Sequence, residues 1–217
     1  MADLDPDRTL ALSYVSARHR PALEALWGLD VALGAVLAGG RDPMLSRIKL
    51  VWWRDALEAL DVKPVPAEPV LQAIAAAVLP LGVTGAELSA MEEGWEVLLS
   101  GDPLTPEDLD TYAAARGAML FRFAARLLGG PERLAGAAGE AWALADLARH
   151  SNEADADAAI ARLRTIPPTA RLPGRLRPLG MLGALGHRDA EPNRPRWEQQ
   201  GAPGRMWRML RHRLTGL

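Results

Sequence analysis

Cysteine is absent from the 217-residue chain, and phenylalanine and tyrosine occur only twice each. The first absence excludes a disulfide scaffold and a cysteine nucleophile. The second, together with 39 alanines, argues against a protein built mainly of β-strands and favours helix. Apolar residues make up 49% of the chain and charged residues 24%, which excludes a disordered protein. Length and composition therefore predict one folded domain with a sizeable core.

An uninterrupted apolar run long enough to span a membrane is also lacking. The longest apolar stretch, residues 22–40, contains Glu24 and Asp30. The first eight residues, Met-Ala-Asp-Leu-Asp-Pro-Asp-Arg, are acidic where a secretory signal is basic. We therefore expect a cytoplasmic protein. The bias of 23 arginines against two lysines is typical of a GC-rich bacterial genome.

Common catalytic and metal-binding patterns are missing as well. The chain has no P-loop, no Gly-x-Ser-x-Gly sequence and no pair of histidines four residues apart. Residues 152–157 have the acidic character of a calcium loop but lack its glycine and its final glutamate. An acidic helix start explains that run more simply, so no metal or cofactor is expected from these patterns.

Charge is unevenly distributed along the chain. The formal net charge is −2, but residues 162–217 hold 12 arginines against Asp189, Glu191 and Glu198. That segment carries +9, which leaves −11 for residues 1–161. An acidic body repels phosphate backbones, so we expect no nucleic-acid partner.

Helix starts and stops recur in residues 1–165. A capping side chain precedes a proline at 5–6, 42–43 and 105–106, and glycine ends a helical pattern at 39, 101 and 129. Apolar residues recur with a period near 3.6, and no segment alternates as a strand does. The sequence predicts an all-α domain with helices near 6–17, 21–38, 43–61, 67–79, 85–99, 106–128, 131–150 and 154–165.

Residues 166–217 differ in composition and are predicted to be a Pro/Arg-rich C-terminal part of the same domain. A helix can form between Pro178 and Gly186, 187–204 is predicted to be irregular, and a basic amphipathic helix follows over 205–214. Met206, Leu210 and Leu214 share a stripe of this last helix. Its surface for a membrane or a protein partner is predicted to consist of Arg205, Trp207, Arg208 and Arg211. The simpler alternative is a solvated, arginine-rich face.

Several segments resemble the squalene/phytoene synthase family. They are Arg-Pro-Ala-Leu-Glu-Ala-Leu-Trp at 20–27, Trp-Trp-Arg-Asp-Ala-Leu at 52–57, and the stretch from Leu109-Asp110-x-Tyr112 to Gly117. Weaker similarity continues from Gly139 to Arg149 and at the C-terminus. The resemblance implies a single-domain, isoprenoid synthase-type helical bundle, shortened at the C-terminus, with residues 1–165 as the synthase-like helical domain.

The same resemblance raises a question about catalysis. Active members condense two prenyl diphosphates, which aspartate clusters on facing helices hold through Mg²⁺. Here the first cluster aligns with residues 34–38, which contain no carboxylate, and the second with His150 and Ala154. The chain therefore looks closer to a non-catalytic branch of complex I assembly factor-like proteins than to true synthases. We expect a non-catalytic isoprenoid- or lipid-binding factor, or a respiratory complex I assembly-type factor, without a cofactor.

Two alternatives stay open. One is an active, Mg²⁺-dependent head-to-head prenyl transferase that uses displaced acids, with Asp146, Glu153 and Asp155 as metal ligands. The other is an interaction module whose Trp52/Trp53 helix contacts a protein. Independently of these alternatives, a peripheral position at the inner membrane is also expected. A cavity for a hydrophobic or prenyl-diphosphate-like ligand is predicted to be lined by Trp27, Asp30, Trp53, Arg54, Tyr112, Arg116, Asp146 and Arg149.

Overall fold

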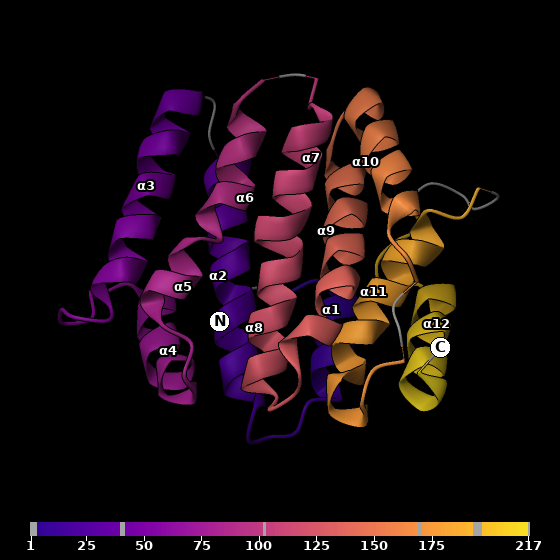
Figure 1. Cartoon of the computed structure of the whole chain (residues 1–217), viewed down its shortest axis with the longest axis horizontal. Coiled ribbons are helices and arrows are strands. Elements are labelled where there is room, and N and C mark those ends of the chain that lie inside the picture. Colours follow the sequence, from indigo (N-terminus) through magenta and orange to yellow (C-terminus); the bar gives the residue numbers. More distant parts are fainter. Residues whose placement is uncertain (1–3, 40–41, 102, 169–170, 193–196, 217) are drawn as a thin grey trace.

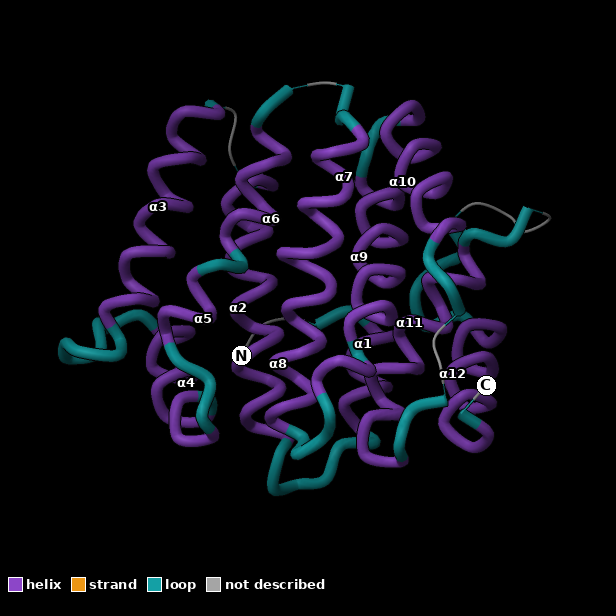
Figure 2. Tube along the Cα trace, viewed as in Figure 1, coloured by secondary structure: helices purple, strands orange, loops and turns teal. Residues whose placement is uncertain are grey.

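The computed structural model describes residues 4–39, 42–101, 103–168, 171–192 and 197–216. Within these ranges the protein is helical and contains no strand, which confirms the all-α prediction. Figures 1 and 2 show the helices side by side in a bundle, with α3 at one edge and α12 at the opposite edge. The α-helices are α1 (Pro6–Ser13), α2 (Arg20–Ala38), α3 (Pro43–Ala59), α4 (Pro69–Ala77), α5 (Gly85–Ser89), α6 (Glu92–Glu96), α7 (Pro106–Tyr112), α8 (Met119–Leu127), α9 (Gly136–His150), α10 (Glu153–Thr165), α11 (Arg177–Asp189) and α12 (Pro203–Thr215).

The helix starts predicted from a capping side chain and a following proline are confirmed, because they depend on local chemistry, whereas the helix predicted to begin at 131 begins at Gly136. The Asp5 side chain accepts hydrogen bonds from the backbone N–H groups of Asp7 and Arg8, and the Asp42 side chain accepts one from Met44. Thr84 and Thr105 each form a capping box with the acidic residue three positions later. Helix lengths are less accurate: the segment predicted as 6–17 ends at Ser13, and 85–99 divides into α5, α6 and a 3₁₀ turn (Val97–Leu99).

The predicted helix 106–128 is interrupted by a π-helical segment, η3 (Ala113–Ala118). Such a segment widens one turn and changes which residues face inward. It brings Gly117 against Gly139 of α9 so closely that a Cβ on Gly139 would lie 2.1 Å from the Gly117 carbonyl oxygen. Two glycines therefore allow η3 and α9 to pack backbone against backbone.

Helix α2 runs through the core. Leu23, Leu26, Trp27 and Leu33 on α2 have no exposed surface. By length and composition α2 could cross a membrane, but 56% of its apolar window is buried inside the protein. This burial identifies α2 as the central helix of the bundle.

The C-terminal part packs onto α9 and α1 through α11 and α12. Helix α11 ends at Asp189 rather than at the predicted Gly186. Its last turn therefore occupies the beginning of the segment 187–204, which was predicted to be irregular. Helix α12 buries Arg205, Met209 and His212, so the stripe of Met206, Leu210 and Leu214 does not face the core.

We expect a Gly139→Ala substitution to lower the free energy of unfolding by about 1–3 kcal/mol, because the added methyl group overlaps the Gly117 backbone. Urea denaturation measures this difference. Gly174→Ala is the matched control, since a Cβ there meets no atom within 4 Å, and it should change stability by less than about 0.5 kcal/mol. Equal effects of the two substitutions would contradict the close packing of η3 on α9.

His212 predicts a pH dependence of stability. Burial, and then the charges of Arg208 and Arg177, lower the pKa of His212 to about 4. Because the unfolded chain binds this proton more readily, stability should fall as the pH drops from about 6.5 to 4, by about 2 kcal/mol between pH 7 and pH 5. His212→Asn should remove that part of the slope in urea titrations at the two pH values. An unchanged slope would show that His212 is not buried in its neutral form.

Candidate functional site

A pocket of about 1040 Å³ is formed between several elements of the bundle. Its residues come from α2, the end of α7, η3 and α9, from the chain around α1, from the segments at 95–104 and 150–155, and from Gln200. One end is buried and polar, whereas Ala35, Ala38 and Gly101 form part of an exposed rim. The rest of the wall has six large apolar side chains, those of Leu4, Val31, Leu37, Leu98, Leu104 and Leu147. It also has six polar ones, those of Asp5, His150, Ser151, Asn152, Asp155 and Gln200.

The buried end is built around the guanidinium group of Arg116, which is 2% exposed. Its Nε and Nη2 donate to the two carboxylate oxygens of Asp30, at 2.8 and 3.0 Å. Its Nη1 donates to Asp146 Oδ2 at 2.7 Å and to the Tyr112 hydroxyl oxygen. One side chain of η3 thus joins aspartates from α2 and α9, and this bidentate geometry is the strong form of the arginine–carboxylate interaction.

Aromatic rings enclose the same guanidinium group. Its central carbon lies 4.3 Å from the Trp95 ring centroid, 4.7 Å from that of Trp142 and 5.4 Å from that of Tyr112. Gly34 makes room for Trp95, because a Cβ on Gly34 would lie 2.8 Å from the edge of the indole. The rings exclude water and stabilise the cation through their π faces.

A second arginine shares the carboxylates. Arg8 Nη1 donates to Asp30 Oδ2 at 3.1 Å, and Arg8 also pairs with Asp5. Burial lowers the pKa of Arg8 and of Arg116, but the surrounding acidic groups, Asp30 first among them, together outweigh this effect and the pKa of each is raised. For the carboxyl group of Asp146, burial raises the pKa. The positive charges of Arg116 and then Arg8 lower it by more than burial raises it, so the net shift is downward. Arg8, Arg116 and Asp146 are therefore charged at neutral pH.

Four of the residues predicted for the cavity lie at this end of the pocket: Asp30, Tyr112, Arg116 and Asp146. Three others do not line it. Trp27 is fully buried in the core, Trp53 packs on the inner side of α3, and Arg54 is beside Asp55 at 3.5 Å on that helix. Helix α3 lies at the edge of the bundle (Figure 1), packs on α2, α5 and α6, and contributes no residue to the pocket.

Arg8 and Trp95 were not predicted from the sequence. A signal for the arginine existed, because Arg8 lies in the first turn of a helix whose cap, Asp5, was recognised. A basic residue at a helix start opposes the helix dipole and needs another explanation. Trp95 gave no comparable signal, since a lone tryptophan is most often a core residue.

Asp146, Glu153 and Asp155, the acids predicted as metal ligands for the transferase alternative, lie in three different environments. Asp146 binds Arg116, whereas Asp155 accepts a hydrogen bond from the backbone N–H of Leu104 at 2.9 Å. Glu153 is exposed at the first turn of α10. Among the residues that the structure describes, no three His, Cys, Asp or Glu side chains are grouped as metal ligands.

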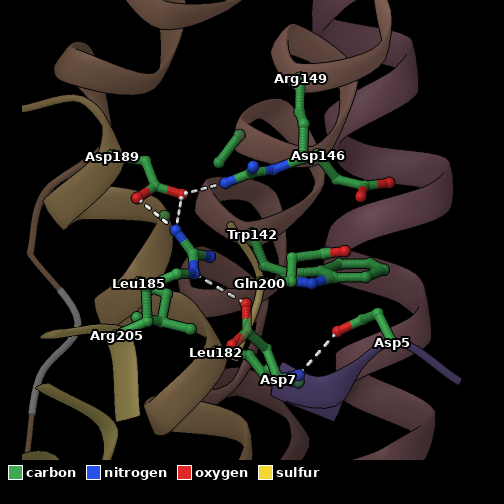
Figure 3. A pocket seen from close by; sticks show the side chains of 12 residues that line it. Asp5, Asp7, Trp142, Asp146, Arg149, Leu182, Leu185, Asp189, Gln200 and Arg205 are labelled. Atoms are coloured by element: carbon green, nitrogen blue, oxygen red, sulfur yellow. Dashed lines mark hydrogen bonds and ion pairs between the residues drawn. The ribbon is translucent and has the colours of Figure 1, made fainter. Parts of the chain in front are cut away.

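Arg149 lies in a smaller cavity next to the pocket, of about 20 Å³ (Figure 3). Arg205 is also there, donating to Asp7 Oδ2 at 2.8 Å and to both oxygens of Asp189 at 2.6 Å. Arg149 Nη2 donates to the same Asp189 at 3.3 Å. The prediction that Arg205 belongs to a membrane or partner surface is wrong, because its two carboxylate partners hold it inside, at 4% exposure.

The other predicted surface residues of α12 are placed differently. Trp207 is 71% exposed, Arg211 is exposed and Arg208 is half-buried. Their role as a docking surface stays a prediction.

Comparison with known protein families identifies the bundle. The squalene/phytoene synthase family profile matches residues 1–167 of the 217-residue chain. The chain belongs to the squalene/phytoene synthase family. Neither curated proteins nor solved structures give a significant match. The helical fold is therefore the isoprenoid synthase-type bundle expected of that family.

Because the chain belongs to this family, the part of the pocket wall formed by α2 bears on whether metal ligands are present there. Residues 34–38, which were predicted to correspond to the first aspartate cluster of synthases, place Gly34, Ala35, Leu37 and Ala38 on the pocket. None of them carries an oxygen ligand for a metal. On this helix the only acid lining the pocket is Asp30, one turn earlier, and both its oxygens are bound to Arg116.

We expect Arg116→Met to lower the free energy of unfolding at pH 7 by about 3–5 kcal/mol, because it leaves Asp30 and Asp146 buried without their cation. The wild type loses the contribution of Asp146, whose pKa is lowered, as the pH falls below about 4. The difference between the two proteins should therefore stay constant down to about pH 4 and shrink below it, which urea denaturation from about pH 7 to about pH 3 measures.

Two further variants control this experiment. Arg122→Met, at an exposed position of α8, should change stability by less than about 0.5 kcal/mol. The triple variant Arg116→Met with Asp30→Asn and Asp146→Asn removes the unpaired charges and should recover much of the loss. If the triple variant is no more stable than the single one, the ion pairs are not the source of the effect.

Proposed function

We propose that this protein is a non-catalytic member of the squalene/phytoene synthase family that binds an isoprenoid- or lipid-like molecule in the pocket beside α2 and α9. The observation that carries the proposal is the position of Arg116. Its guanidinium group takes up carboxylate oxygens of both Asp30 and Asp146, the acids that face each other from the two helices.

This arrangement disfavours a divalent cation. Mg²⁺ needs oxygen ligands at about 2.1 Å in octahedral geometry. Here both oxygens of Asp30 and one of Asp146 already accept hydrogen bonds, and two guanidinium groups stand where a metal would be attracted. A metal ion could bind these carboxylates only if it displaced the guanidinium group of Arg116, which aromatic rings enclose.

A site that disfavours a divalent cation also disfavours the family reaction. Ionisation of an allylic diphosphate relies on divalent cations that stabilise the leaving group, an effect worth several kcal/mol and thus orders of magnitude in rate. Arg8 and Arg116 are the cations at the buried end, and both are engaged with aspartates. Transfer of a prenyl group is therefore the less favoured function.

The remaining wall suits a hydrocarbon. Side chains of leucine, valine and alanine line the pocket between its buried end and its rim, and a volume of about 1040 Å³ accommodates a large apolar molecule. A polar head could contact His150, Ser151 or Asn152 at the rim, where these side chains line the pocket. An amphipathic ligand fits this combination better than a small polar metabolite.

A role in assembly of respiratory complex I follows from the resemblance to the non-catalytic branch of the family. It stays a prediction, as does a position at the inner membrane. Ligand binding in the pocket is compatible with such a role, because a filled pocket stabilises the folded protein that a partner would recognise.

We expect farnesol or geranylgeraniol to quench the tryptophan fluorescence of the protein equally with Mg²⁺ and with EDTA. Ala35→Trp places an indole in the pocket at an exposed position of α2 and should weaken this binding by roughly tenfold or more without lowering stability. Ala76→Trp, at an exposed position of α4 outside the pocket lining, is the matched control and should bind like the wild type.

Catalysis is tested in parallel. Incubation with farnesyl or geranylgeranyl diphosphate and Mg²⁺ should give no squalene, no phytoene and no cyclopropyl intermediate. Formation of any of them by the wild type, lost in Asp30→Asn or Asp146→Asn, would overturn the proposal and establish the transferase.

A further inference from the structure

We propose that the outer face of α12 docks onto the surface of an anionic phospholipid bilayer. This face is defined by Trp207, Leu210 and Leu214, which lie at positions i, i+3 and i+7 and therefore share one side of the helix. It is opposite the side that packs on the body through Arg205, Met209 and His212. The inference does not depend on what the pocket binds.

The orientation of α12 is unusual for a soluble bundle. Trp207 is 71% exposed, Leu214 77% and the neighbouring Met206 39%, whereas the charged Arg205 is turned inward. The contacts of Arg205 with Asp7 and Asp189 explain this rotation, since a buried guanidinium group needs both carboxylates. The rotation leaves large apolar side chains facing outward.

The charge around this face is positive. Residues 199–216 contain no aspartate or glutamate. Arg211 is exposed beside Trp207 and Leu214, and the half-buried Arg208 and Arg213 lie on opposite flanks of the apolar stripe. Arg213 also lies over the ring of Tyr14, 5.5 Å from its centroid, so a second partly exposed aromatic residue adjoins the helix.

These features match an interfacial amphipathic helix. Apolar side chains enter the boundary between headgroups and acyl chains, tryptophan prefers that depth, and flanking arginines contact lipid phosphates. Charge complementarity therefore selects an anionic bilayer as the occupant of this face.

Another apolar surface lies on α3, at the opposite edge of the molecule (Figure 1). It consists of Met44, Ile48, Val51 and Trp52, which are all exposed. Asp55 follows them on the same side of the helix, one turn after Trp52, and Glu58 is exposed nearby. These carboxylates offset the exposed Arg47 and Lys49 of the same helix, so α3 provides a control of similar apolar character and lower net positive charge.

The test is flotation of the full-length protein with vesicles of phosphatidylcholine alone, or with about 30 mol% phosphatidylglycerol added. The wild type should float with the anionic vesicles, less at high salt, and not with the neutral ones. Arg211→Glu should weaken binding by more than roughly fivefold, the effect of one basic residue near an anionic surface, because it reverses the charge. Trp207→Ser with Leu214→Ser should weaken it by at least tenfold.

Trp52→Ser on α3 is the matched control and should float like the wild type. Circular dichroism melting confirms that each variant is folded, which is expected because the substituted side chains are exposed. Failure of the wild type to float with anionic vesicles, or equal losses in the α3 and α12 variants, would overturn the proposal. So would a dimer in solution that Trp207→Ser converts to a monomer, since the face would then be covered by a second copy of the chain.

Discussion

The structure depends on one buried cation, the guanidinium group of Arg116. It joins three segments that are far apart in the sequence, because Asp30 lies on α2, Asp146 on α9 and Arg116 itself on η3. A charge that is 2% exposed is tolerated only when it is paired and hydrogen-bonded, so the three segments must keep their mutual positions. The contact between Gly117 and Gly139 supports this arrangement by letting η3 approach α9 closely. The family fold is thus retained around an internal cation, at the place where its active members are expected to gather metal ions between facing helices.

Features decided by neighbouring residues could be predicted from the sequence, and features decided by distant ones could not. The caps at Asp5, Asp42, Thr84 and Thr105 involve side chains within three residues of the groups they bind, so the helix starts were correct. The π-helical turn at η3 has no local signal, and its effect on the direction of Arg116 was not foreseen. The family resemblance predicted that Asp30, Tyr112, Arg116 and Asp146 line one cavity. It did not predict that these side chains bind one another. It also placed Trp53 and Arg54 in the cavity, whereas the position of α3 in the bundle depends on tertiary packing.

The uneven charge of the sequence acquires a structural explanation. Part of the positive charge after residue 161 is engaged in ion pairs: the buried Arg205 binds Asp7 and Asp189, the buried Arg188 pairs with Glu198, and Arg162 pairs with Asp110 at the surface. Arg177 donates to the backbone carbonyls of Arg213 and Leu214 at the end of α12, where a cation also favours the helix dipole. Asp7 and Asp110 of the acidic body thus bind arginines of the basic C-terminal part. A composition-based interpretation that assigns all of these arginines to solvent overestimates the exposed positive charge.

Helix α1 connects the two regions of interest. Asp7 contacts α12 through Arg205, and the adjacent Arg8 contacts the buried end of the pocket through Asp30. If α12 moved away from the body, Asp7, which is 3% exposed, would lose its cation, and a buried unpaired carboxylate is costly. The backbone N–H of Gly201 also donates to Asp7, which fixes the segment that leads into α12. Helix α12 is therefore held firmly, and its apolar outer face is a permanent feature of the folded surface. A bilayer or another partner can contact that face without displacing α12 from the bundle or disturbing the ion pairs at the pocket.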